Sequence, residues 1–208
     1  MNTIQPTKIV CVGRNYARHA AELGNEIPAE PLIFLKPPSA LVGPGDAIVL
    51  PAGVGRVDYE GEIGLVLGRG GRGIRELDAW AHVAAVAPVN DVTARDLQRR
   101  DSQWTRAKGF DTFCPVGRPV GAEGLDPSAL NVVTRVNGEV RQEGAARDMV
   151  YSIAFLVSYI SRIMTLEPGD LIVTGTPEGV GPLSPGDEVE IELPGIGVLR
   201  NPVRQGVT

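Results

Sequence analysis

Hydrophobic and polar residues alternate without interruption over residues 188–193, which is the two-residue period of a strand with one buried and one exposed face. Residues 132–136 and 139–141 flank Asn137-Gly138, the dipeptide typical of a tight β-hairpin turn. Proline fixes φ at the second position of a turn and glycine supplies a positive φ at the third. We therefore predict three turn-then-strand units from a recurring Pro-Gly-Asp sequence, at residues 44–46, 168–170 and 185–187.

Helical patterns are fewer. They predict short helices over residues 16–23, 75–86 and 150–164. The last helix is capped by Asp148 in this prediction, and it carries an apolar stripe for packing over a sheet: Ile153, Leu156, Ile160 and Ile163. Together the patterns predict a mainly β (α+β) fold, with a single domain over residues 1–208 and a few covering helices.

Composition narrows the functional classes. The 20 Lys and Arg against 25 Asp and Glu give a net charge of −5. This balance disfavours nucleic-acid or anionic-membrane partners, because both need a basic face. The longest weakly polar run, residues 151–161, is too short to span a bilayer. Two cysteines are too few for a disulfide framework, so we expect a cytoplasmic protein in which Cys11 and Cys114 are buried structural thiols.

Three acidic residues are candidate metal ligands. Glu60 and Glu62 stand two apart in a predicted strand, so their carboxylates share one face. A bound cation would relieve their repulsion; the alternative is an exposed acidic strand edge. Asp91 closes the apolar run 83–90, where an unpaired carboxylate would be costly. Carboxylate oxygens suit Mg²⁺ or Mn²⁺, Ca²⁺ is also compatible, and the chain offers no Cys/His set for zinc.

His19 and Glu22 are a second candidate pair. At i and i+3 on a helix they face the same way, so the carboxylate can bond one ring nitrogen and leave the other as a base. The alternative is two exposed surface side chains. His82, in an Ala-rich segment without an acidic neighbour at helical spacing, is interpreted as structural.

A glycine-rich segment over residues 68–73 imitates a dinucleotide-binding fingerprint, since it matches G-x-G-x-x-G and follows a predicted strand. The strand before it contains two glutamates, whereas the first strand of such a domain is apolar on both faces. We favour a surface turn and keep a nucleotide-binding domain using Gly68–Gly73 as the non-enzyme alternative.

Six motifs in order resemble the fumarylacetoacetate hydrolase family, and the resemblance is nearest to its short, acylpyruvase-like branch. They are residues 11–16 with His19 and Glu22, 34–37, 58–62, 90–98, 108–111 and 174–181. The resemblance implies a mixed β-sandwich roll, a homodimer, and a Mg²⁺ or Mn²⁺ site at Glu60, Glu62 and Asp91. It also implies a mobile lid, about residues 15–30, that bears the His19 and Glu22 pair. Asn15 stands about where the full-length enzymes have a further acidic ligand.

This family implies an enzyme that hydrolyses the C–C bond of acylpyruvates or related 2,4-dioxo acids through a metal-bound pyruvate enolate. His19, oriented by Glu22, would activate water, and Lys108 would neutralise substrate charge. The expected substrate contacts are Arg14, Lys36, Arg95, Gln98, Gly175 and Thr176. Oxaloacetate decarboxylation and 2-hydroxyhepta-2,4-diene-1,7-dioate isomerisation stay open as alternatives, because they use the same site and a small 2-oxo acid.

Overall fold

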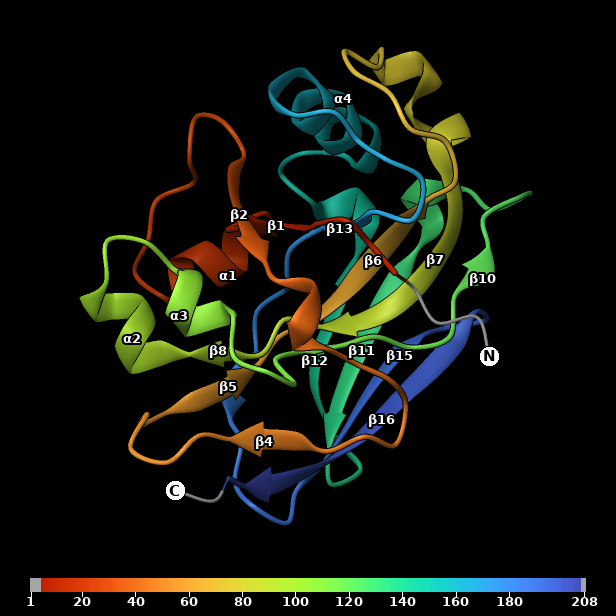
Figure 1. The fold of residues 1–208 in the computed structure, drawn as a ribbon. Coiled ribbons are helices and arrows are strands. Elements are labelled where there is room, and N and C mark those ends of the chain that lie inside the picture. Colours follow the sequence, from red (N-terminus) through yellow and green to blue (C-terminus); the bar gives the residue numbers. More distant parts are fainter. Residues whose placement is uncertain (1–4, 207–208) are drawn as a thin grey trace.

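The computed structural model describes residues 5–206 (Figure 1). The strands are β1 Ile9–Gly13, β2 Leu32–Lys36, β3 Leu41–Val42, β4 Ile48–Leu50, β5 Val57–Tyr59, β6 Gly61–Leu67, β7 Val83–Asn90, β8 Thr93–Ala94, β9 Cys114–Pro115, β10 Val120–Gly121, β11 Asn131–Val136, β12 Glu139–Ala145, β13 Leu171–Val173, β14 Gly181–Pro182, β15 Glu188–Leu193 and β16 Gly197–Gln205. The α-helices are α1 Ala17–Glu22, α2 Arg95–Arg100, α3 Thr105–Lys108 and α4 Ile153–Ile163. Short 3-10 segments are η1 Pro38–Ala40, η2 Glu76–His82, η3 Pro127–Ala129 and η4 Ala146–Asp148.

Two large sheets build the core. One has the order β10-β7-β6-β13-β1-β2 and the other β12-β11-β15-β16-β4, and two small sheets have the orders β14-β5-β8 and β3-β9. Strands β6 and β7 of the first large sheet pack against β11, β15 and β16. Fully buried side chains such as Leu65, Val132 and Ile191 fill the space between them. The mainly β fold with few helices is confirmed.

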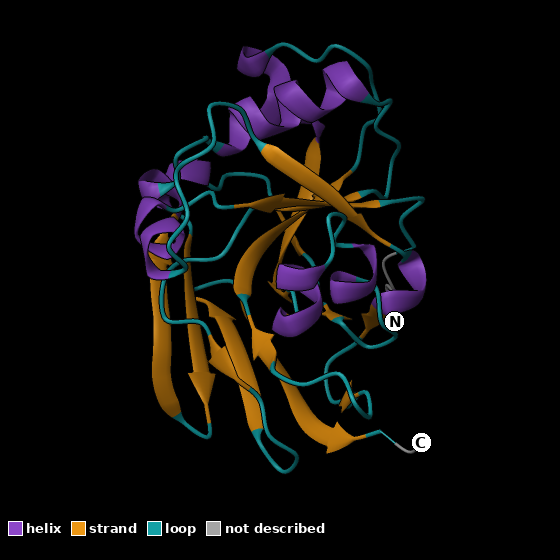
Figure 2. Ribbon diagram, turned by 90° about the vertical axis from the view of Figure 1, so that its left-hand side faces the viewer, coloured by secondary structure: helices purple, strands orange, loops and turns teal. Residues whose placement is uncertain are grey.

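The helices lie at the periphery of the sheets. Figure 1 shows α1, α2 and α3 gathered on one side of the molecule, and α4 over one end; Figure 2 shows the same strands and helices from the side. Helix α4 packs on η2, and its Leu156 and Ile160 are buried. The arrangement leaves the ends of β1, β5 and β7 next to α1 to α3.

The predicted turns and hairpin are confirmed. Gly45, Gly169 and Gly186 have φ values of 85°, 90° and 97°, and each precedes a strand. Asn137 and Gly138, at φ 54° and 81°, join β11 to β12. In β15 the three hydrophobic residues are buried, and the glutamates between them are partly or fully exposed.

Two helix predictions need correction. Residues 75–86 do not form one helix: η2 ends at His82 and β7 begins at Val83. Strand β7 pairs antiparallel with both β6 and β10, and that pairing outweighs the helix preference of its alanines. The cap of α4 is Ser152, whose Oγ accepts a hydrogen bond from the Phe155 N–H at 3.2 Å, so the prediction of Asp148 was wrong.

Helix α4 and the segment after β8 hold two further differences. Ile163, expected in the buried stripe of α4, is 48% exposed because it ends the helix. Helices α2 and α3 were not predicted, since each has at most six residues and no repeated apolar spacing. None of the helices within residues 5–206 is long and apolar enough to cross a membrane.

The glycine-rich segment 68–73 joins β6 to η2, and the next strand, β7, runs antiparallel to β6. A dinucleotide-binding turn instead opens the crossover between parallel strands, so the topology speaks against that function. Buried His82 has its Nδ1 3.0 Å from the Arg69 carbonyl oxygen, in agreement with a structural role. Cys11 and Cys114 are buried free thiols, as predicted.

Candidate active site

The three predicted metal ligands meet at the junction of β5 and β6. Strand β5 ends before Glu60, whose N–H donates to Asn90 Oδ1 at 2.9 Å and whose carbonyl accepts from the Asp91 N–H at 2.8 Å. These two bonds bring the end of β7 to the start of β6. One carboxylate oxygen from each of Glu60, Glu62 and Asp91 lies within 4.8 Å of the others, and all three residues are buried.

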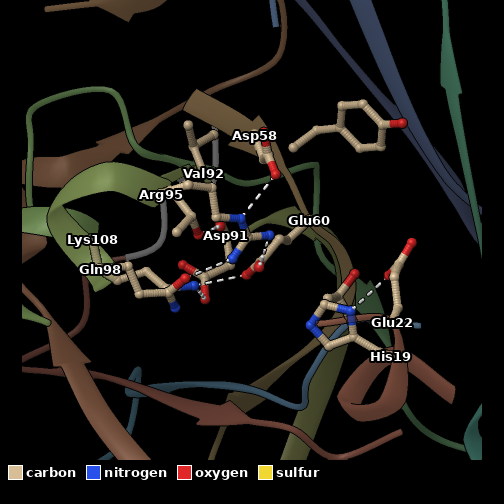
Figure 3. Close-up of polar contacts among 12 residues, drawn as sticks. His19, Glu22, Asp58, Glu60, Asp91, Val92, Arg95, Gln98 and Lys108 are labelled. Atoms are coloured by element: carbon tan, nitrogen blue, oxygen red, sulfur yellow. Dashed lines mark hydrogen bonds and ion pairs between the residues drawn. The ribbon is translucent and has the colours of Figure 1, made fainter. Parts of the chain in front are cut away.

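Three cations surround this acidic cluster, and Figure 3 shows two of them, Lys108 and Arg95. Lys108 Nζ is 2.7 Å from Glu60 and 2.6 Å from Asp91. Lys36 forms an ion pair with Asp91 and donates to the Val92 carbonyl at 3.1 Å. An Arg95 guanidinium nitrogen is 2.6 Å from Glu60. Burial opposes ionisation of Glu60, but Arg95 and Lys108 outweigh it and lower the pKa of that carboxyl.

Glu62 lacks such compensation. It forms no ion pair within residues 5–206, and the Gly175 N–H donates to it at 2.5 Å. Burial, followed by repulsion from Asp91 and Glu60, raises the pKa of Glu62 well above its ordinary value. A divalent cation would supply the missing positive charge, and the donor set consists of carboxylate oxygens. The residues present therefore fit a hard cation such as Mg²⁺ or Mn²⁺.

His19 and Glu22 lie beside the cluster. His19, on α1, is only 4% exposed, and its Nδ1 is 3.3 Å from Glu22 Oε2. Glu22 also accepts hydrogen bonds from the Gly179 N–H at 3.0 and 3.2 Å. In Figure 3, Glu22 lies on the side of the imidazole away from Glu60. The burial of His19 and its location rule out the alternative of two exposed side chains.

A cavity of about 340 Å³ joins these groups. Its lining includes nine of the twelve predicted site residues, all except Glu22, Lys36 and Gly175, together with residues that were not predicted; the nine are Arg14, His19, Glu60, Glu62, Asp91, Arg95, Gln98, Lys108 and Thr176. Lys36 and Gly175 instead contact Asp91 and Glu62 from outside the cavity. Among the predicted substrate contacts, these two thus hold carboxylates of the cluster.

Asp58 is a residue of the site that sequence reasoning missed. Its carboxylate is fully buried and accepts from Arg95 Nε at 2.8 Å and from Arg56 Nε at 2.7 Å. Arg95 also donates to Gln98 Oε1 at 2.8 Å, so its guanidinium is already held on three sides. The signal available in the sequence was the position of Asp58, two residues before Glu60.

Two aromatic residues of the cavity were also missed. Phe34 and Trp104 meet edge to face with ring centroids 5.3 Å apart. Lys108 Nζ lies 4.8 Å from the centre of the Phe34 ring. Both rings line the cavity, and Phe34 gives the cationic end of Lys108 an apolar wall.

Asn15 does not contribute a donor to the cavity. Its amide nitrogen donates to the carbonyl oxygens of Thr174 and Tyr151 at 2.9 and 3.1 Å, and its Oδ1 accepts from the Tyr151 N–H at 2.8 Å. The side chain thus ties the end of β13 to the segment before α4.

Comparisons with known proteins identify the family of the chain. Residues 8–204 match the family described as Fumarylacetoacetate (FAA) hydrolase C-terminal. The mitochondrial oxaloacetate tautomerase FAHD1 of Mus musculus is 44% identical over 202 residues, which cover 95% of this chain and 91% of the mouse protein.

Two solved structures share the fold. Fumarylpyruvate hydrolase from Pseudomonas aeruginosa, in complex with Mn²⁺ and pyruvate, superposes with a TM-score of 0.93 at 35% identity, covering 99% of this chain and 92% of that one. For 5-carboxymethyl-2-hydroxymuconate delta-isomerase from Mycobacterium smegmatis the TM-score is 0.91 at 47% identity, with 99% and 81% covered. The chain belongs to the fumarylacetoacetate hydrolase family, whose members are enzymes acting on small organic acids.

Proposed function

We propose that the protein is a Mg²⁺- or Mn²⁺-dependent hydrolase that cleaves the C–C bond of acylpyruvates or related 2,4-dioxo acids. The observation that carries this proposal is the placement of buried His19, paired with Glu22, in one cavity with three converging carboxylates. A histidine held by a carboxylate is suited to take a proton from water. The fumarylpyruvate hydrolase relative, solved with Mn²⁺ and pyruvate, supports the same chemistry.

Glu60, Glu62 and Asp91 would hold the cation. When bound, it supplies a Lewis acid that stabilises negative charge on the oxygens of the 2-oxo acid. Glu62 is the ligand that gains most, because within residues 5–206 it forms no ion pair, whereas Glu60 and Asp91 each pair with Lys108.

The remaining residues act on the substrate and on water. Glu22 faces Nδ1 of His19, so the other ring nitrogen, Nε2, takes the proton of a water that attacks the distal carbonyl. The bond between C3 and that carbonyl then breaks, and pyruvate leaves as its enolate and is protonated at C3. One water and one acylpyruvate thus give one carboxylic acid and pyruvate. Arg14 and Lys108, which line the cavity, neutralise the substrate carboxylate.

A second candidate is a reaction without attack by water: proton transfer to or from carbon in tautomerisation or isomerisation of a 2-oxo acid, or decarboxylation, in which the C3–C4 bond breaks, CO₂ leaves and C3 is protonated. The 44% identity to a mouse oxaloacetate tautomerase and the 47% identity to a hydroxymuconate isomerase favour it. In this case His19 moves a proton to or from carbon, and the cluster and Lys108 keep the roles given above.

The test is an activity panel with Mg²⁺ or Mn²⁺ and after exhaustive chelation. The substrates are acetylpyruvate, fumarylpyruvate, oxaloacetate and 2-hydroxyhepta-2,4-diene-1,7-dioate. We expect acylpyruvate hydrolysis to have the highest kcat/KM and to stop on chelation. Full activity without a divalent cation, or isomerisation far faster than any hydrolysis, would overturn the proposal.

A further inference from the structure

Gln142 is a buried amide outside the cavity that connects two parts of the site. It lies on β12 and is 2% exposed. Its Oε1 accepts from the Gly61 N–H at 2.9 Å, and its Nε2 donates to Thr176 Oγ1 and to the Pro177 carbonyl, both at 2.8 Å. A buried amide with all these bonds made fixes the segments that it joins.

The first of these segments is Gly61, the residue between two candidate metal ligands. Gly61 separates Glu60 from Glu62, and Thr176 Oγ1 donates to the Gly61 carbonyl at 2.9 Å. Gly61 is therefore held at its N–H by Gln142 and at its carbonyl by Thr176. The orientation of both glutamates depends on Gly61, because one peptide bond joins it to Glu60 and the next joins it to Glu62.

The second segment is the loop over residues 174–180, between β13 and β14. It donates the Gly175 N–H to Glu62 at 2.5 Å and the Gly179 N–H to Glu22 at 3.0 Å. One loop thus contacts a carboxylate of the acidic cluster and the carboxylate that orients His19.

The loop also packs tightly against β12. Gly179 has a φ of 95°, and a Cβ there would lie 2.0 Å from the Arg141 carbonyl oxygen, next to Gln142 in the chain. Only glycine fits this position. The close approach lets Gln142 reach both Thr176 and Pro177, so its amide is the side-chain link between β12 and the loop.

We infer that Gln142 is a positioning residue: it holds loop 174–180 so that one backbone N–H meets Glu62 and another meets Glu22. Its effect on turnover rests on the proposed function, whereas its effect on cation binding and on loop order does not. Loss of the amide frees the Gly61 peptide and the loop together, and both carboxylates lose their fixed donors.

The test compares Gln142→Met, which keeps the length of the side chain but removes all three hydrogen bonds, with Asn201→Leu. Asn201 is an equally buried amide that donates to the carbonyls of Gly43 and Asp46 and does not line the cavity. Three quantities are compared. Calorimetry measures the Mn²⁺ affinity, hydrogen exchange measures the order of residues 17–23 and 175–180, and steady-state kinetics give kcat/KM on the best substrate. Circular dichroism checks that both variants fold, and thermal unfolding compares their stabilities.

We expect Gln142→Met to weaken Mn²⁺ binding about 10- to 100-fold, the range typical of residues that orient metal ligands, and to speed exchange in both segments. Asn201→Leu should change neither beyond its loss of stability. Equal Mn²⁺ affinity and exchange in the two variants would overturn the inference. If the wild type turns over no substrate of the panel, the proposed function fails, but the binding and exchange results still decide the role of Gln142.

Gln142→Glu keeps the protein testable if the Met variant does not fold. The carboxylate can still accept from the Gly61 N–H but cannot donate to Thr176 or Pro177. Exchange over 175–180 should therefore rise in this variant as well, and exchange equal to the wild type would contradict the inference.

Discussion

Nζ of Lys108 lies 2.6 Å from Oδ2 of Asp91, and both side chains are almost completely buried. The same ammonium reaches Glu60 at 2.7 Å, so one cation compensates two of the three clustered carboxylates. A divalent ion bound to those carboxylates would share them with Lys108, and the two positive charges repel each other.

Lys108→Met should therefore separate cation binding from catalysis. We expect Mn²⁺ affinity to be equal or higher, because the competing charge is gone, and kcat/KM to fall at least about 100-fold, because the substrate carboxylate loses its partner. The metal-free variant should be destabilised, since removing one partner of a buried ion pair costs about 3–5 kcal/mol, and Mn²⁺ should restore part of that loss. Calorimetry and thermal unfolding measure these effects, and loss of Mn²⁺ binding in the variant would contradict them.

Glu62→Gln should weaken Mn²⁺ binding and nearly abolish turnover. The amide keeps the size of the side chain but removes the charge that a cation would neutralise. Because the same change also removes repulsion from Asp91 and Glu60, the metal-free variant should unfold at the same temperature as the wild type or a higher one. Unimpaired activity without added metal would refute the assignment.

The pH dependence of Mn²⁺ binding follows from the same residue. The pKa of Glu62 is raised in the metal-free protein, so its carboxyl keeps a proton above its ordinary value of 4.5, and the cation must displace that proton. Affinity should rise as the pH increases above that ordinary value, and the rise should be smaller in Glu62→Gln. Titrations at several pH values, in buffers of different ionisation enthalpy, measure the proton released. A pH-independent wild type would be inconsistent with this reasoning.

His19→Ala and Glu22→Ala should distinguish the two candidate reactions. Each should lower kcat/KM for acylpyruvate hydrolysis at least about 100-fold, a typical effect of losing a general base. Oxaloacetate decarboxylation should suffer less, because it needs a stabilised enolate but no attacking water. Single-turnover rates avoid masking by product release. If both activities fall equally, His19 does not act by activating water.

The segment over residues 15–30 should be mobile without ligand and close over the substrate. Leu23 and Ile27 are 39% and 50% exposed, and the Tyr151 hydroxyl donates to the Pro28 carbonyl at 2.6 Å as one of few contacts beyond α1. Few buried apolar contacts give low local stability. Hydrogen exchange there should slow when oxalate is added with Mn²⁺, while β15 serves as the unchanged reference. Identical exchange with and without oxalate would argue against a lid.

Asp170 provides a prediction on stability away from the cavity. Burial opposes its ionisation, but hydrogen bonds from Lys8 and Glu167 outweigh burial and lower the pKa of Asp170 below its ordinary value of 3.8. A carboxyl whose pKa is lowered by folding stabilises the fold at pH values above its pKa in the unfolded chain. This stabilisation is lost as the pH falls through the pKa of the carboxyl in the folded protein. Asp170→Asn should thus cost about 1.5–3 kcal/mol at pH 7 and progressively less below pH 4. Urea unfolding at both pH values measures the difference.

Local patterns were enough to predict the acidic cluster and much of the fold. The spacing of Glu60 and Glu62 places both on one face, and the end of an apolar run locates Asp91 in the interior. The Pro-Gly-Asp turns succeeded for the same reason, because turn chemistry depends on neighbouring residues. Residues 83–86 failed because their structure depends on pairing with β6 and β10, which no local window contains.

The contacts that orient the site were beyond local reasoning. The Gly175 N–H that binds Glu62 is 113 residues away in the chain, and Asp58 and Arg95 meet over 37 residues. The spacing of His19 and Glu22 correctly predicted that they face each other, but not the burial of His19, which depends on what α1 packs against. Arg95 was expected at the substrate, and its bonds to Asp58 and Glu60 became visible only in three dimensions.

Strand β13 occupies the middle of the six-stranded sheet, between β6 and β1, although it comes late in the chain. It pairs parallel with β1, through residues 9–11 and 171–173. The β1-β2 part and the β10-β7-β6 part of this sheet can therefore join only after residues 171–173 are present. Pairings between such distant segments form slowly. A nascent chain ending before Leu171 has an unpaired edge on both β1 and β6, and it lacks the loop that meets Glu62 and Glu22. Tight capture of a divalent cation should then be one of the last events of folding, after most of the polypeptide has been synthesised.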